Sequence, residues 1–135
     1  MRYQFNETMP AEYISLQERS GCRKSDPLTA VQALRNTSFM VGICEGEELV
    51  AFGRIVGDDA SYYLVCDIMV DERLQARETY AKLILKELRD YVLTTAPAGG
   101  KVLAFVDRPY DELCRQFGFK YLDEDYQAAM VRRTR

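Results

Sequence analysis

Residues 67–83 have the sequence DIMVDERLQARETYAKL and join the end of one predicted strand to the start of a predicted helix. The strand, residues 62–70, is almost continuously apolar, as in a strand that is buried on both faces. The helix, residues 77–93, places its apolar side chains on one face. In such a unit the free backbone N–H groups of the first helical turn point beyond the strand end, where the helix dipole favours a negative charge. The stretch therefore predicts an anion site.

Outside this unit, strand and helix patterns follow one another along the chain. The additional predicted strands are residues 2–6, 39–44, 49–56, 101–106, 119–122 and 127–132. The additional predicted helices are residues 10–20, 27–36 and 109–117. Turn residues separate the segments, and the last two strands are joined around Asp123-Glu124-Asp125. This order predicts a mixed α/β (α+β) protein.

Composition limits the function classes. The chain has 135 residues, of which 47% are hydrophobic and 29% charged, so we expect a single globular domain over residues 1–135. A net charge of −3 argues against a nucleic-acid partner and favours a neutral or cationic small molecule. The first ten residues do not resemble a signal peptide, and no apolar run approaches the roughly 20 residues of a membrane span. We expect a cytoplasmic protein without a membrane partner.

Cysteine and histidine usage excludes several chemistries. The four cysteines form no CxxC pair or tight cluster, so neither a disulfide framework nor a zinc site is indicated. The chain contains no histidine, which removes histidine-based catalytic triads and histidine-based metal sites. We therefore expect no metal, and any acid or base must be Asp, Glu, Tyr, Cys or Lys.

The central unit resembles the acetyl-CoA-binding segment of the GNAT N-acetyltransferases. The likeness rests on the run Asp67–Val70, on Gln75, which four residues separate from Val70, and on the following helix. Phe117-Gly118-Phe119 resembles the family's late Gly-Phe element, and the order of elements is similar from end to end. The resemblance implies a GNAT-like fold with a central mixed, mostly antiparallel sheet of six or seven strands, flanked by about four helices.

The resemblance also implies acetyl-CoA as the cosubstrate. The backbone near the end of the central strand would orient the thioester, and the following loop would hold the pyrophosphate. In the family that loop carries two glycines, whereas here Glu78 and Tyr80 occupy their positions. Glu78 places a carboxylate beside the phosphate position, although it could also stand in for an anion, and the Tyr80 ring must swing away or block access. The implied cofactor-binding residues are Ile68, Met69, Val70, Gln75, Ala76, Arg77, Glu78, Thr79, Tyr80 and Ala81.

Three residues are candidates for catalysis. Asp67 is a general base or an anchor for the substrate amine, with the alternative that it caps nearby backbone amides. The resemblance places Cys114 where the family commonly has a tyrosine that protonates the departing thiolate. A thiol is a poor acid for another thiolate, because its ordinary pKa of about 8.5 is close to that of the leaving group. Tyr110, one helical turn earlier, is the replacement candidate.

Two functions remain open. The first is acetyl transfer from acetyl-CoA to the amine of a small molecule or peptide. The second is a binding or interaction module that keeps the fold but no longer uses acetyl-CoA, which Glu78, Tyr80 and Cys114 favour. The sequence does not name the amine and leaves open whether the protein is a monomer or a homodimer.

Overall fold

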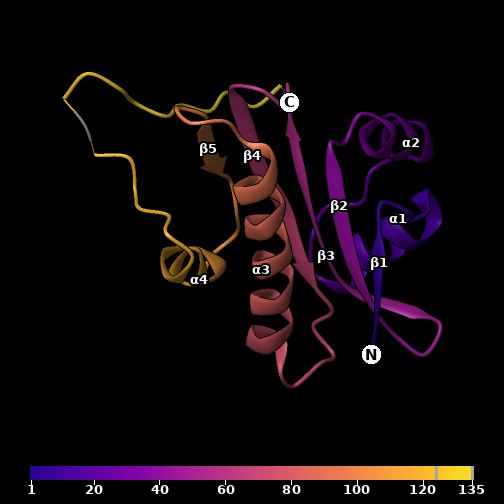
Figure 1. The fold of residues 1–135 in the computed structure, drawn as a ribbon. Coiled ribbons are helices and arrows are strands. Elements are labelled where there is room, and N and C mark those ends of the chain that lie inside the picture. Colours follow the sequence, from indigo (N-terminus) through magenta and orange to yellow (C-terminus); the bar gives the residue numbers. More distant parts are fainter. Residues whose placement is uncertain (124, 135) are drawn as a thin grey trace.

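The computed structural model describes residues 1–123 and 125–134 and contains one mixed sheet with helices on both faces (Figure 1). The strands are β1 (Arg2–Phe5), β2 (Phe39–Glu45), β3 (Glu48–Gly57), β4 (Tyr62–Val70) and β5 (Lys101–Ala104). The helices are α1 (Pro10–Arg19), α2 (Pro27–Arg35), α3 (Arg77–Thr95) and α4 (Tyr110–Gln116). The four predicted helices and the first five predicted strands are thus confirmed.

The sheet has five strands in the order β1-β2-β3-β4-β5, so the prediction of six or seven was wrong for the described residues. All neighbours are antiparallel except β4 and β5, which are parallel. The predicted strands at 119–122 and 127–132 do not pair, and Glu124 of their predicted turn lies outside the described residues. Large apolar side chains there, such as Tyr126 and Met130, stay exposed. Without a buried face, nothing offsets the entropy of ordering a hairpin.

Local sequence explains where α1 and α2 begin. Both α1 and α2 have proline at the first helical position, which fixes a helical φ and lacks an N–H that would have no partner. The Asp26 carboxylate accepts the Thr29 backbone N–H at 3.0 Å and so caps α2. The Met9 N–H donates to Glu12 at 3.0 Å at the start of α1.

The helices form a layer on each face of the sheet. In Figure 1, α3 covers one face, and α1 and α2 lie against the other. The apolar stripe of α3, which includes Ile84 and Leu88, is buried in the core on its own side. A second core on the opposite side contains Tyr13 of α1, Leu34 of α2 and Phe52 of β3. These two cores hold the middle of β4 between them.

A bulge interrupts β4 at Asp67. Phe52 pairs with Met69 and Arg54 with Cys66, so one residue of β3 faces two of β4. Asp67 takes φ = 55°, the left-handed conformation that an extra residue in a bulge commonly adopts. The Asp67 side chain thereby reaches the α1 side of the sheet, where Tyr13 contacts it.

Beyond the bulge, β4 continues without β5 beside it. The β4–β5 pairing ends at Val65 and Ala104, followed by one hydrogen bond from the Phe105 N–H to the Val65 carbonyl. The chain after β5 then turns away toward α4 while β4 runs on to Val70. The pairing of the two strands therefore ends two residues before Asp67, after which β4 leads to α3 and β5 leads to α4.

Candidate functional site

A groove of about 390 Å³ separates the start of α3 from α4. It brings together four residues that the sequence identified as candidates, of which Gln75, Arg77 and Glu78 lie at the start of α3 and Tyr110 lies on α4. Leu113 of α4 lies at its wall. The polar lining residues are Gln75, Arg77, Glu78, Tyr110, Glu112 and Gln116.

The N-terminus of α3 is uncapped. Ala76 stands at the capping position and offers no side-chain acceptor. The Ala76 carbonyl accepts the Thr79 N–H at 3.1 Å and the Tyr80 N–H at 3.3 Å, and the latter is the first α-helical bond. The backbone N–H groups of Arg77 and Glu78 have no acceptor in residues 1–123 and 125–134. A helix of 19 residues thus directs free donors and the positive end of its dipole toward the groove.

The two side chains at the glycine positions behave differently. Tyr80 turns away from the groove and donates its hydroxyl to Glu45 of β2 at 2.9 Å, with its ring packed against the core. Glu78 remains at the groove, 68% exposed, and its carboxylate lies 3.4 Å from Lys82 Nζ. Steric blockage by Tyr80 therefore does not arise, and the charge of Glu78 is what an anionic ligand would meet.

The other proposed cofactor residues divide by burial. Ala76 and Thr79 are exposed at the helix start, whereas Ala81 is fully buried in the core. The side chains of Ile68, Met69 and Val70 are buried in the two cores. Residues 68–70 could thus contact a ligand only through their backbone, along the part of β4 that β5 does not cover.

Asp67 lies in the part of β4 that β5 does not cover, on the α1 side of the sheet. Two side chains hold its carboxylate. Its Oδ2 accepts the Tyr13 hydroxyl at 2.5 Å and Arg54 Nε at 2.6 Å. Its Oδ1 accepts no hydrogen bond from any described residue, and the side chain is 30% exposed. The carboxylate does not cap backbone amides here, so one oxygen remains open to a ligand.

Tyr13 keeps its proton in this arrangement. Burial raises the pKa of the Tyr13 hydroxyl well above its usual range, and the adjacent Asp67 carboxylate raises it further. Tyr13 is thus a hydrogen-bond donor at neutral pH and holds Asp67 in the orientation that leaves Oδ1 open. Sequence patterns could not identify Tyr13 or Arg54, which lie 54 and 13 residues from Asp67 along the chain.

Of the two candidate acids on α4, Tyr110 reaches the groove and Cys114 does not. Burial raises the pKa of Tyr110, although the nearby Arg77 lowers it, so the hydroxyl is protonated at neutral pH. Cys114 is buried in the core beside α3, and burial also raises the pKa of its thiol. Of the two predicted acids, only Tyr110 is therefore placed where a ligand in the groove would meet it.

Cys22 is a residue that the sequence did not single out. Its Sγ lies 3.9 Å from Oδ2 of Asp107, so the loop after α1 contacts the segment after β5. Burial raises the pKa of the Cys22 thiol. The two residues are 85 positions apart, so no local pattern could have indicated that they meet.

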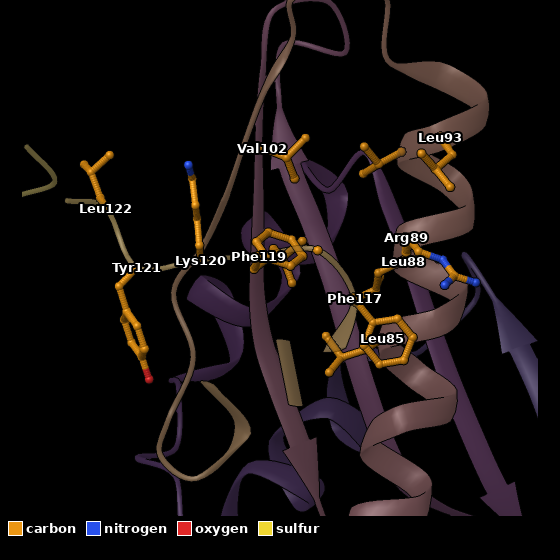
Figure 2. Close-up of a pocket in the computed structure, with 13 residues that line it drawn as sticks. Leu85, Leu88, Arg89, Leu93, Val102, Phe117, Phe119, Lys120, Tyr121 and Leu122 are labelled. Carbon is orange, nitrogen blue, oxygen red and sulfur yellow. The ribbon is translucent and has the colours of Figure 1, made fainter. Parts of the chain in front are cut away.

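A separate apolar groove of about 370 Å³ lies along the second half of α3 (Figure 2). Leu85, Leu88 and Arg89 of α3 form one wall, and Phe117 and Phe119 lie opposite. None of the candidate catalytic or cofactor residues lines it. Gln75, Arg77, Glu78 and Tyr110 line the other groove, at the first turn of α3.

Solved structures of other proteins share this architecture. No family model and no curated sequence matches the chain. Among solved structures, a protein of unknown function from meticillin-resistant Staphylococcus aureus, described as a probable acetyltransferase, matches with a TM-score of 0.86 at 23% identity and 98% coverage of both chains. A GNAT-family acetyltransferase from Streptococcus pneumoniae matches with a TM-score of 0.76 at 18% identity, over 99% of this chain and 98% of its own.

A third match is a ribosomal-protein-alanine N-acetyltransferase from Brucella melitensis, with a TM-score of 0.65 at 17% identity, over 98% of this chain and 99% of its own. At these identities the likeness concerns the fold. The protein has a GNAT-like α+β fold with a five-stranded mixed sheet and four helices, and its structural neighbours are acetyltransferases. No helix within the described residues is long and apolar enough to cross a membrane.

Proposed function

We propose that the protein transfers an acetyl group from acetyl-CoA to the amine of a small molecule or peptide. The observation that supports this proposal is the position of the uncapped first turn of α3 beside the groove that Tyr110 of α4 also lines. An anion site at that point would place an attached thioester within reach of the part of β4 that β5 does not cover, where Asp67 lies.

On the donor side, the pyrophosphate of coenzyme A would bind the free N–H groups of Arg77 and Glu78, with the Arg77 guanidinium beside them. The backbone of residues 68–70 would orient the thioester along the uncovered part of β4. Most of the rate would come from alignment, because the reaction joins two bound molecules. No metal enters this scheme.

On the acceptor side, the amine would approach from the layer formed by α1 and α2. Its nitrogen attacks the thioester carbonyl carbon, so an N–C bond forms and the C–S bond breaks. Asp67 Oδ1 accepts a hydrogen bond from the amine and takes up its proton. Tyr110, which is protonated at neutral pH, donates a proton to the departing thiolate. The products are the N-acetyl amide and free coenzyme A.

One observation favours a second function, that of a binding module without acetyl transfer. The Glu78 carboxylate lines the groove where a phosphate would bind. At roughly 6 Å, repulsion between two unit charges ranges from about 0.7 kcal/mol in water to about 3 kcal/mol at a dielectric of about 20. Glu78 is 68% exposed and next to Lys82, so the lower part of this range applies. Such a penalty weakens cofactor binding without abolishing it.

Calorimetry with acetyl-CoA separates the two functions. Micromolar binding would exclude the module in its simple form, and no detectable binding at millimolar concentration would exclude the acetyltransferase. We expect Glu78→Gln to tighten binding by about three- to tenfold. Glu18→Gln on α1 is the matched control, since Glu18 is also 68% exposed and beside a lysine, and it should leave the affinity unchanged. An equal response of the two variants would refute the account of Glu78.

A further inference from the structure

In the ion pair between Arg54 and Asp67, each side chain keeps one hydrogen-bonding group without a partner among the described residues. The carboxylate keeps an acceptor and the guanidinium keeps a donor. We infer that the acceptor is a free amino acid, that is, an amine with a carboxylate on the adjacent carbon, bound with its amine at Asp67 and its carboxylate at Arg54. This inference rests on the proposed function and specifies its substrate class.

The contacts of Arg54 define the open donor. A guanidinium group has five N–H donors arranged in one plane. Nε donates to Asp67 Oδ2 at 2.6 Å, and Nη1 donates to Thr37 Oγ1 at 3.1 Å and to the Ala33 carbonyl at 3.4 Å. Nη2 donates to no acceptor in the part of the chain that the structure describes. One N–H of Nη2 lies on the same edge of the guanidinium as the Nε N–H, so it points to the side on which Asp67 lies.

Arg54 and Asp67 therefore pair through one atom each, Nε and Oδ2, and not through two parallel bonds. An arginine and a carboxylate can form two parallel bonds from Nε and Nη2, but here Asp67 uses Oδ2 alone and gives its second bond to Tyr13. The result is an open acceptor, Oδ1, and an open donor, Nη2, on half-buried side chains that touch each other. A ligand that offers an amine to the first and a carboxylate to the second completes both.

The surroundings of Arg54 favour an anion. Arg54 lines a groove of about 460 Å³ between α2 and the β3–β4 part of the sheet. The described lining includes no aspartate or glutamate, and its polar residues besides Arg54 are Thr29 and Gln32 on α2 and Asn36 directly after it. A carboxylate that enters this groove meets neutral polar groups and the guanidinium of Arg54, whose Nε is already paired with Asp67 at 2.6 Å. A substrate with its carboxylate there and its amine at Asp67 would direct its nitrogen toward the gap between β4 and β5.

This arrangement discriminates between amines. A substrate without a carboxylate leaves the Arg54 Nη2 donors to water, and an amide or peptide places a neutral group against the guanidinium. A half-buried polar group without its partner is costly, so sites built around such a group reject analogues that lack the matching function. We expect a free amino acid to exceed its own amide by roughly tenfold or more in kcat/KM.

The experiment compares each of the 20 standard L-amino acids with its amide at saturating acetyl-CoA, with the N-acetyl product measured by mass spectrometry. At least one amino acid should show the tenfold preference. In Arg54→Gln the amino acid-to-amide ratio should fall below about twofold, mainly through KM. In Asp67→Asn both members of a pair should lose activity equally, so that the ratio persists. Arg35→Gln, at an exposed arginine of the same helix layer, is the control and should change neither quantity.

Binding is measured in parallel by ligand-observed NMR with the same amino acids and amides, on protein with free coenzyme A. Acetylation without a carboxylate preference in any pair would overturn this inference and retain the proposed function. Binding of amino acids over amides that depends on Arg54, without acetylation, would support the site and overturn the proposed function. The absence of both acetylation and binding would overturn both.

Discussion

Asp71 ties the loop between β4 and α3 to the rest of the molecule, and its removal is predicted to destabilise the fold in a pH-dependent way. The carboxylate is 1% exposed and accepts Arg19 Nη1 and Arg73 Nη2, each at 2.6 Å, and the Arg73 backbone N–H at 2.9 Å. Arg73 also reaches Glu48 on β3 at 2.5 Å. One buried carboxylate thus joins α1, the β2–β3 hairpin and the loop that leads to the proposed anion site.

The expected loss in Asp71→Asn is about 2 to 3 kcal/mol in the free energy of unfolding. Breaking a fully buried ion pair costs about 3 to 5 kcal/mol. The smaller value applies because asparagine keeps one acceptor oxygen and Arg73 is largely exposed. For a domain of this size each kcal/mol corresponds to about 3 to 5 °C, so Tm should fall by about 6 to 15 °C at pH 7.

The pH dependence follows from the lowered pKa of Asp71 in the folded state, which the hydrogen bonds from Arg73 cause first and those from Arg19 reinforce. Below the unfolded pKa of about 3.9, the unfolded chain binds a proton that the folded protein does not yet bind. The contribution of Asp71 is therefore complete above about pH 5 and is lost as the pH falls through the folded pKa. The Tm difference between the wild type and Asp71→Asn should narrow below about pH 4.

Thermal unfolding followed by circular dichroism at pH 7, 5, 4 and 3 checks both parts of this prediction. Asp90→Asn on α3 is the control, since Asp90 also pairs with two cations, Lys86 and Arg89, but at an exposed site. Its Tm should change by less than about 3 °C. A fall in Tm of less than about 3 °C in Asp71→Asn would refute the reasoning. So would a Tm difference between Asp71→Asn and the wild type that stays constant from pH 7 to pH 3.

Three further predictions concern the core and the groove. Gly53→Ala should lower the free energy of unfolding by about 1 to 3 kcal/mol in denaturant titration, because the added methyl group would lie 2.6 Å from the Ile84 side chain. Tyr110→Phe should lower kcat by about 10²-fold or more with little change in KM. Cys114→Ala should leave kcat within about threefold. A larger loss of kcat in Cys114→Ala than in Tyr110→Phe would assign the acid to the cysteine. Arg77→Gln should weaken acetyl-CoA binding by roughly tenfold in calorimetry and weaken it less at high salt.

Much of the fold could be predicted from local patterns, since each confirmed element has its own period and turn signals. The pattern of α3 gave both its length and its buried face, with Ala81, Ile84, Leu85 and Leu88 in the core. The C-terminal hairpin was predicted by the same reasoning and is absent from the described residues. Alternation of polar and apolar residues makes a strand favourable only where a neighbour pairs with it and one face is buried. Neither condition can be established from the segment itself.

The site was predictable to a smaller extent. The location of Asp67 and of the first turn of α3 follows from one contiguous stretch of sequence, and the structure brings Tyr110 to the groove beside that turn. The state of Asp67 does not follow from that stretch, because Tyr13 and Arg54 reach it from other elements. The bulge that turns Asp67 toward them depends on how β3 and β4 align, which no local period encodes.

Helix geometry explains why the two substitutions at the glycine positions have unequal consequences. Residues two apart on a helix point about 200° away from each other, so Glu78 and Tyr80 cannot both face the groove. Tyr80 finds an acceptor in Glu45, which lies 35 residues earlier on β2, and its ring then adds to the core. The exposed backbone at the helix start is consequently free of that ring, as it would be with glycine. Of the two substitutions, Glu78 is therefore the one whose side chain a bound pyrophosphate would meet, and Lys82 partly offsets its charge.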